Sequence, residues 1–105
     1  MYDAIYVRVS TRSQDQRSQL ADLQRWATAN SDSVRWYRDS ATGTNMARPD
    51  WQRLERDLRA GKLRSIIVWR LDRLGRTAKG LTALFAELLD RRVNLVSLCE
   101  GVDLS

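Results

Sequence analysis

Short apolar runs and longer amphipathic stretches alternate along the chain. The apolar runs fall at residues 6–10, 34–39, 65–69 and 93–99, and their length is typical of strands. The third run contains Ile66, Ile67 and Val68 in succession, as expected for a strand that is buried on both faces. These runs predict four strands.

Between the strands, apolar residues recur every three or four positions, which predicts three helices. A polar loop is expected over residues 11–18, followed by a helix that ends near Asn30 with a stripe of Leu20, Leu23, Trp26 and Ala27. After a second polar loop over residues 40–48, the next helix is expected to begin at Pro49, run to Ala60 and stop at Gly61, with Trp51, Leu54 and Leu58 on its stripe. The third helix is expected from about Thr77 to Asp90, with an apolar face of Leu81, Leu84, Phe85, Leu88 and Leu89.

The order of strand, helix, strand, helix, strand, helix, strand predicts a single α/β domain over residues 1–105. We expect three layers, with a mainly parallel sheet of four or more strands and helices on both faces. Ligands bind beyond the carboxyl ends of the strands in such sheets. Ser10, Asp39 and the segment 70–76 lie at these ends, so we expect them to converge. The last residues, 101–105, show no evident closing element.

The charge of the chain indicates what kind of partner the domain binds. Among 105 residues, 18 are basic and 13 are acidic, and only Lys62 and Lys79 of the basic residues are not arginine. The net charge of +5 makes a nucleic acid or an anionic surface the expected partner. No apolar run is long enough to span a membrane and the amino end has no signal-peptide pattern, so we expect a cytoplasmic protein.

Missing residue types narrow the chemistry. The chain has no histidine and one cysteine, so histidine-based triads, histidine–zinc sites and an intrachain disulfide are excluded. Cys99 follows an apolar run and is expected to be a buried core thiol. Neither of the common glycine-rich phosphate-binding motifs is present, so nothing but the topology favours a nucleotide cofactor. We expect no cofactor and no metal.

The first strand delivers unusual residues to its end. Side chains alternate across a strand, so Tyr6, Arg8 and Ser10 share one face. An arginine beside a strand-terminal serine suits phosphate chemistry, because guanidinium groups bind phosphate oxygens in bidentate geometry and can stabilise the negative charge of a phosphodiester under attack. Taken alone, Ser10 would more often be a strand cap.

The chain resembles the serine recombinase family of resolvases and invertases. The resemblance rests on motifs in the same order and spacing, and it extends through residues 101–103 to cover nearly the whole chain: Tyr6-Val7-Arg8-Val9-Ser10-Thr11, Gln14, Gln19, Ala47-Arg48-Pro49 and Leu71-Asp72-Arg73-Leu74-Gly75-Arg76. It implies that Ser10 attacks a DNA phosphate to form a 5′-phosphoserine link, and that strands are exchanged in a tetramer and religated without metal or ATP. The outcome would be resolution, inversion, integration or transposition.

The resemblance also implies roles for the other motif residues. Arg8, Arg48, Arg73 and Arg76 would bind the scissile phosphate. Asp72 would orient these arginines or take part in proton transfer, although an ordinary surface ion pair is its alternative role. Gln14, Gln19 and Asp39 would support the site. The base that deprotonates Ser10 stays open between Asp39 and Asp72, and neighbouring arginines would make either carboxylate a weaker base.

Several residues have simpler structural explanations. Tyr6 and the four tryptophans are expected in the core, and Trp69 is expected to pack beneath the arginine motif that follows it. Arg70 is expected to be exposed. Arg53, Arg56 and Arg59 are expected on the outer face of the second helix as solvated groups or DNA-backbone contacts.

In that family the catalytic domain continues into a dimerisation helix and a DNA-binding domain, and we expect both to be absent from this chain. We therefore expect a monomeric catalytic domain that does not complete recombination alone and binds DNA weakly, without sequence specificity and with a strong salt dependence. One alternative is a non-catalytic, arginine-rich module that binds nucleic acid. Another is a doubly wound nucleotide-binding or regulatory domain.

Overall fold

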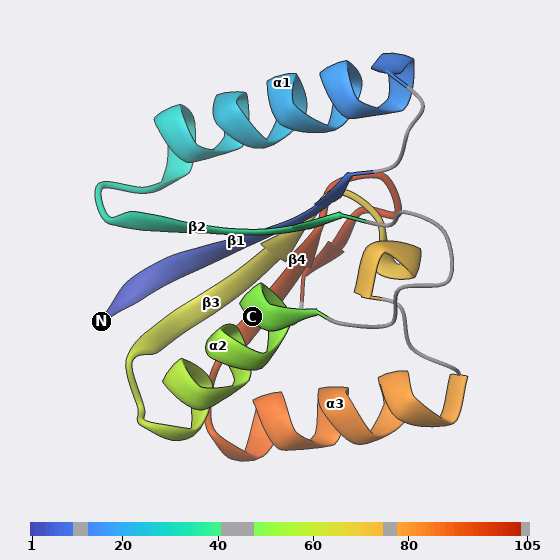
Figure 1. The fold of residues 1–105 in the computed structure, drawn as a ribbon. Coiled ribbons are helices and arrows are strands. Elements are labelled where there is room, and N and C mark those ends of the chain that lie inside the picture. Colours follow the sequence, from blue (N-terminus) through green and yellow to red (C-terminus); the bar gives the residue numbers. More distant parts are fainter. Residues whose placement is uncertain (10–12, 41–47, 75–77, 104–105) are drawn as a thin grey trace.

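The chain forms a five-stranded sheet with helices on both faces, as Figure 1 shows for the computed structural model. The structure describes residues 1–9, 13–40, 48–74 and 78–103. The elements are β1 (Tyr2–Val9), α1 (Ser13–Asn30), β2 (Val34–Ser40), α2 (Pro49–Arg59), β3 (Leu63–Val68), the 3₁₀ helix η1 (Leu71–Leu74), α3 (Ala78–Asp90), β4 (Asn94–Ser97) and β5 (Val102–Asp103). Within these ranges, no helix is both long enough and apolar enough to cross a membrane.

The sheet has the strand order β2-β1-β3-β4-β5, so β1 lies between β2 and β3. The first four strands are parallel, and β5 pairs antiparallel with β4. In Figure 1, α1 covers one face while α2 and α3 cover the other. The three-layer, mainly parallel arrangement predicted from the alternating elements is therefore confirmed.

Two hydrophobic clusters fill the space between the layers. Alternate residues of β1 enter opposite clusters, with Ala4 and Tyr6 facing α2 and α3 and with Ile5 and Val7 facing α1. All four side chains are fully buried. The sheet is thus covered on both sides at its centre, and polar chemistry is displaced to its ends.

Helix α2 matches its predicted bounds closely. Pro49 is its first residue, where the missing N–H costs nothing, and the helix ends at Arg59. Gly61 follows with a φ of +75°, and the N–H groups of Gly61 and Lys62 donate to the carbonyls of Leu58 and Asp57 at 3.1 Å each. This Schellman closure explains why a glycine stands there.

Helix α1 begins at Ser13, so the predicted loop over residues 11–18 is wrong from that residue onward. The error has a physical cause, because apolar periodicity marks only those turns of a helix that pack against the sheet. Arg17 and Ser18 are exposed, and the helix runs through them without an apolar signal. Glutamine and arginine are good helix formers, which is consistent with this extension.

The carboxyl-terminal part of the chain differs from prediction in four ways. Strand β4 ends at Ser97 because the chain turns toward β5, and Cys99 lies exposed in that turn rather than in the core. Leu89 lies at the margin of the apolar face of α3 and is 59% exposed. The short strand β5 closes the sheet edge, and the sequence contained no clear sign of it.

Candidate active site

Polar side chains from separate segments meet at the carboxyl ends of β1, β2 and β3. Arg8 is the penultimate residue of β1 and stands in register with Asp39 on β2. Arg48 immediately precedes α2, and Asp72 lies in η1 after β3. The predicted convergence of these segments is therefore seen for their described parts, since η1 also contacts β1.

Some of the predicted site residues cannot be placed. Ser10 and Arg76 lie outside the described residues. For Gln14 in α1 and Arg73 in η1 the description covers the backbone only. The predicted loop over residues 40–48 lies outside it between residues 41 and 47, while Ser40 belongs to β2.

Asp39 caps helix α2 from the neighbouring strand. Its carboxylate is buried, with 5% of the residue exposed, and it accepts the N–H groups of Asp50 at 3.1 Å and Trp51 at 2.9 Å. These are free donors of the first helical turn, where a negative charge also suits the helix dipole. In return, the Asp50 carboxylate accepts the N–H of Arg38 at 2.7 Å. The start of α2 is thus locked to β2.

Tyr6 connects this cap to Arg48. Its hydroxyl donates to Asp39 at 2.8 Å and accepts from Nη2 and Nε of Arg48 at 3.1 and 3.3 Å. The Arg48 guanidinium also lies over the rings of Tyr6 and Trp51, 5.5 and 5.2 Å from their centroids. Burial, helped by the bond to Asp39, raises the Tyr6 pKa to about 12, so the hydroxyl keeps its proton. Tyr6 is therefore a core residue, as predicted, and also a link within the site that the sequence alone did not indicate.

Arg8 near the end of β1 is contacted by Gln19 of α1. The Gln19 side chain is 1% exposed, and its Nε2 donates to the Arg8 carbonyl at 3.3 Å. The Arg8 side chain is half-buried, and its Nε is inaccessible with no hydrogen-bond partner among the described residues. A buried donor without a partner costs about 1–3 kcal/mol, so this guanidinium is suited to receive an anion. Gln19 helps to hold the strand that presents it.

The segment after β3 is anchored on both sides of the sheet. Trp69 is buried and its Nε1 donates to Asp22 of α1 at 2.9 Å, while the exposed Arg70 guanidinium lies 4.7 Å from the Trp69 ring centroid. The expectation that Arg70 is exposed is confirmed. Leu74 is fully buried among α2 and α3 residues, and Asp72 is exposed between these anchors.

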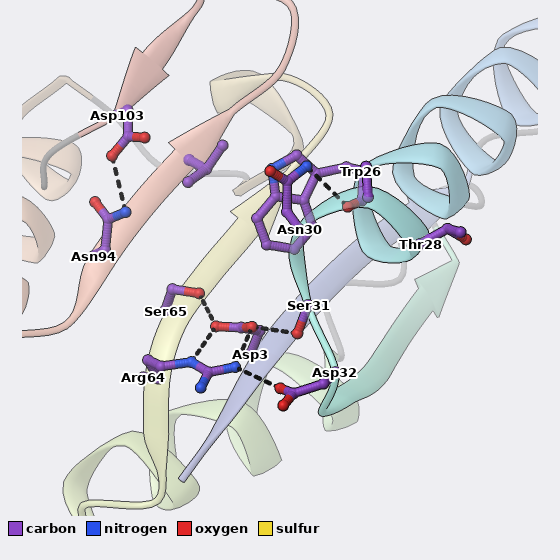
Figure 2. Close-up of a pocket in the computed structure, with 12 residues that line it drawn as sticks. Asp3, Trp26, Thr28, Asn30, Ser31, Asp32, Arg64, Ser65, Asn94 and Asp103 are labelled. Atoms are coloured by element: carbon purple, nitrogen blue, oxygen red, sulfur yellow. Dashed lines mark hydrogen bonds and ion pairs between the residues drawn. The ribbon is translucent and has the colours of Figure 1, made fainter.

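A second polar cluster occupies the opposite, amino-terminal edge of the sheet, and sequence reasoning missed it. Figure 2 shows Asp3 of β1 surrounded by Arg64, Ser65 and Ser31. The Arg64 fork donates to both carboxylate oxygens of Asp3, at 3.1 and 2.7 Å, and Arg64 also pairs with Asp32 at 3.6 Å. An open depression of about 690 Å³ adjoins the cluster. These bonds, led by the one from Arg64, lower the Asp3 pKa to about 2 against the effect of burial.

Comparison with known proteins identifies the family. Residues 4–105 match the family model of the resolvase N-terminal domain. The chain belongs to the resolvase family. The serine recombinase Gin of Escherichia phage Mu is 39% identical over 100 residues, which are 95% of this chain and 48% of Gin. The DNA-invertase Hin of Salmonella typhimurium is 37% identical over 100 residues, which are 95% of this chain and 49% of Hin.

A solved structure supports the same assignment for the fold. The N-terminal catalytic domain of TP901-1 integrase superposes on this resolvase domain with a TM-score of 0.76 and 32% identity, covering 98% of this chain and 81% of the integrase chain. The resolvase domain spans about half the length of the curated relatives it matches. The resemblance seen in the motifs is thus confirmed at the level of family and fold.

Proposed function

We propose that this resolvase domain is the catalytic domain of a site-specific DNA recombinase in which Ser10 is the nucleophile. The observation that carries the proposal is the Arg8 guanidinium, whose buried Nε has no partner among the described residues at the carboxyl edge of the sheet. Ser10 follows two residues later in the sequence, and Arg48 is held at the same edge. Family membership supports reading this edge as a phosphate site.

The proposed reaction is a transesterification. The Ser10 Oγ attacks the phosphorus of a DNA phosphodiester, the bond from phosphorus to the 3′ oxygen breaks, and the released oxygen takes up a proton as a 3′-hydroxyl. The product is a 5′-phosphoserine link. Because one phosphate ester replaces another, the reverse attack by a 3′-hydroxyl of an exchanged strand can rejoin the DNA without an external energy source.

The arginines would stabilise the charge that develops on the non-bridging phosphate oxygens. We assign this role to Arg8, Arg48, Arg73 and Arg76. Asp39 would act through structure, because its carboxylate oxygens are occupied by the α2 amides and the Tyr6 hydroxyl. This leaves Asp72 as the better candidate of the two for proton transfer or arginine orientation, with Gln14 and Gln19 as supporting residues.

The proposed partner is double-stranded DNA, bound through its backbone with a strong salt dependence. We expect self-association into a dimer and tetramer in a recombinase of the length of its relatives, and we expect the protein to work in the cytoplasm. Gin, Hin and TP901-1 integrase are named as a recombinase, an invertase and an integrase, so they support the reaction type while leaving its outcome open.

The test is covalent trapping. The chain would be joined at its carboxyl end to the carboxyl-terminal half of Gin and incubated with a DNA duplex that carries the Gin site. One strand would be labelled in separate samples at its 5′ or its 3′ end. On a denaturing gel, only the 3′-labelled fragment should be retarded by protein, because the serine is joined to the 5′ phosphate of that fragment.

Ser10→Ala should abolish the linked band while leaving the gel shift of the intact complex unchanged. A wild-type hybrid that occupies its site yet forms no linked band would refute the proposal and favour the arginine-rich binding module. Linkage that persists in Ser10→Ala would assign the nucleophile elsewhere.

A further inference from the structure

We propose that Glu100 is a positioning residue for the segment that presents Asp72 and Arg73. This inference rests on the proposed function. Glu100 lies in the turn between β4 and β5, outside every motif that the sequence analysis singled out. It touches the active-site segment through the backbone N–H of Leu71, so its effect on the reaction would be indirect.

The contact is made at the first residue of η1. The Leu71 N–H donates to both carboxylate oxygens of Glu100, with a distance of 3.3 Å to each. The Ser97 hydroxyl, at the end of β4, donates to Oε1 of the same carboxylate. Ser97 is 1% exposed, so it holds the carboxylate from the buried side. A side chain on an exposed turn is thereby given a defined direction toward η1.

The turn that carries Glu100 is itself fixed to the exit of β3. The N–H groups of Leu98 and Cys99 donate to the carbonyls of Val68 and Trp69 at 3.1 and 2.9 Å. These two bonds continue the pairing of β3 and β4 beyond the strands. Figure 1 shows this turn beside the chain that leads from β3 into η1. These two bonds therefore hold the turn that carries Glu100 close to Leu71.

The other end of η1 is held by packing. Leu74 is fully buried in the cluster beneath α2 and α3, and Leu71 packs against the same cluster. Asp72 and the backbone of Arg73 lie between the Glu100 contact and Leu74. Without Glu100, the start of η1 loses a charge-assisted hydrogen bond, and the segment becomes free to shift relative to β1. A shift of about 1 Å in a catalytic group can cost about 100-fold in rate.

Charge alone predicts the opposite effect. A carboxylate beside a phosphate-binding edge repels DNA, so its removal should strengthen binding slightly. If Glu100 positions η1, its removal should slow cleavage even though binding is undiminished. The sign of the change in rate therefore separates the two explanations.

The experiment compares three variants that each remove one negative charge. Glu100→Ala removes the hydrogen-bond acceptor, and Glu100→Gln keeps an acceptor oxygen. Glu87→Ala is the control, because Glu87 on α3 pairs with Arg91 and with Arg59 of α2, away from η1. Single-turnover linkage would be measured in the Gin hybrid with the DNA site saturated. The amide signal of Leu71 and the thermal midpoint would be measured in the 105-residue chain by NMR and calorimetry.

Glu100→Ala is expected to slow linkage by about 10- to 100-fold, while Glu100→Gln and Glu87→Ala stay within about threefold of wild type. The Leu71 amide proton should move upfield in Glu100→Ala and remain near its position in Glu87→Ala. Wild-type rates in Glu100→Ala, or equal slowing in Glu87→Ala, would overturn the positioning role alone. An inactive wild-type hybrid would overturn the proposed function and this role together.

Discussion

The two ends of the sheet contain the same kinds of charged residue and use them differently. At the amino end, the Asp3 carboxylate is satisfied by Arg64, Ser31 and Ser65. At the carboxyl end, the Arg8 guanidinium retains a buried donor without a partner among the described residues. The Asp3 carboxylate is paired within the protein, whereas under the proposed function a DNA phosphate would complete the pairing of Arg8. The two charged groups therefore differ in internal pairing, although Asn94 Oδ1 beside the Asp3 cluster is also buried without a partner among the described residues.

Asp39 shows that the carboxyl end also contains a structural part. It is as deeply buried as Asp3, with 5% of each residue exposed, and its oxygens accept bonds from α2 and Tyr6. The cap sets the position of α2, and Arg48 is the residue immediately before that helix. Arg8, whose Nε has no partner among the described residues, thus stands in register with a fully paired Asp39. Under the proposed function this arrangement suits preorganised electrostatic catalysis.

The largest expected effect comes from replacing one arginine with alanine at each end of the sheet. Arg8→Ala should lower the rate of phosphoserine formation in the Gin hybrid by about 100- to 1,000-fold, since it removes a donor to the developing charge. Arg64→Ala, the matched control, should leave the rate within about threefold and instead lower the thermal midpoint. Equal losses of rate in both variants would end the distinction between the two edges.

Removal of the Asp39 carboxylate tests whether it stabilises the start of α2. Asp39→Ala leaves the Asp50 and Trp51 amides without their acceptor and should lower the free energy of unfolding by about 3 kcal/mol. Urea denaturation followed by circular dichroism would measure it. Asp32→Ala serves as the control, because the Asp32 side chain is 93% exposed and its pair with Arg64 is worth less than about 1 kcal/mol. If Asp39→Ala lowers the free energy of unfolding by less than about 1 kcal/mol, the capping role is contradicted.

The amino-terminal cluster should appear in the pH dependence of stability. The Asp3 pKa is about 2 in the folded state, below its ordinary value of 3.8, so the folded state binds fewer protons than the unfolded state. This carboxylate should contribute about 2 kcal/mol that is present above pH 4 and lost as the pH falls toward 2. Asp3→Asn should be less stable at pH 7 and flatten the profile between pH 4 and 2. An unchanged slope in denaturation at pH 2, 3 and 4 would rule out this contribution.

The smallest effect is expected for Tyr6, whose hydroxyl links Arg48 to Asp39 at the carboxyl edge of the sheet. Tyr6→Phe keeps the ring beneath Arg48 and removes the hydroxyl that joins Arg48 to Asp39. We expect about 1 kcal/mol of lost stability and about a tenfold slower linkage at saturating DNA. Tyr37→Phe is the control, since that hydroxyl bonds Asp57 away from this edge. A similar rate loss in Tyr37→Phe would mean that the Tyr6 effect is general loosening.

The order and type of the main elements followed from the sequence, because the apolar residues have a strand or helix period wherever they face a core. Val7 and Ile67 in the strands and Leu54 in α2 carry such signals, and Pro49 and Gly61 mark the bounds of that helix through local backbone chemistry. The motif residues also pointed to the carboxyl edge, since parallel strands bring their ends together.

Only the tertiary structure decided how the polar groups are paired. The bond between Tyr6 and Asp39 joins residues 33 positions apart, that between Trp69 and Asp22 spans 47, and the Asp3 cluster reaches across 61 to Arg64. Period and composition report which face a residue occupies, but a hydrogen bond depends on distances set by strand register and helix placement. The same limit explains the exposure of Cys99 and the contact of Glu100 with Leu71, because both depend on where the chain turns after β4.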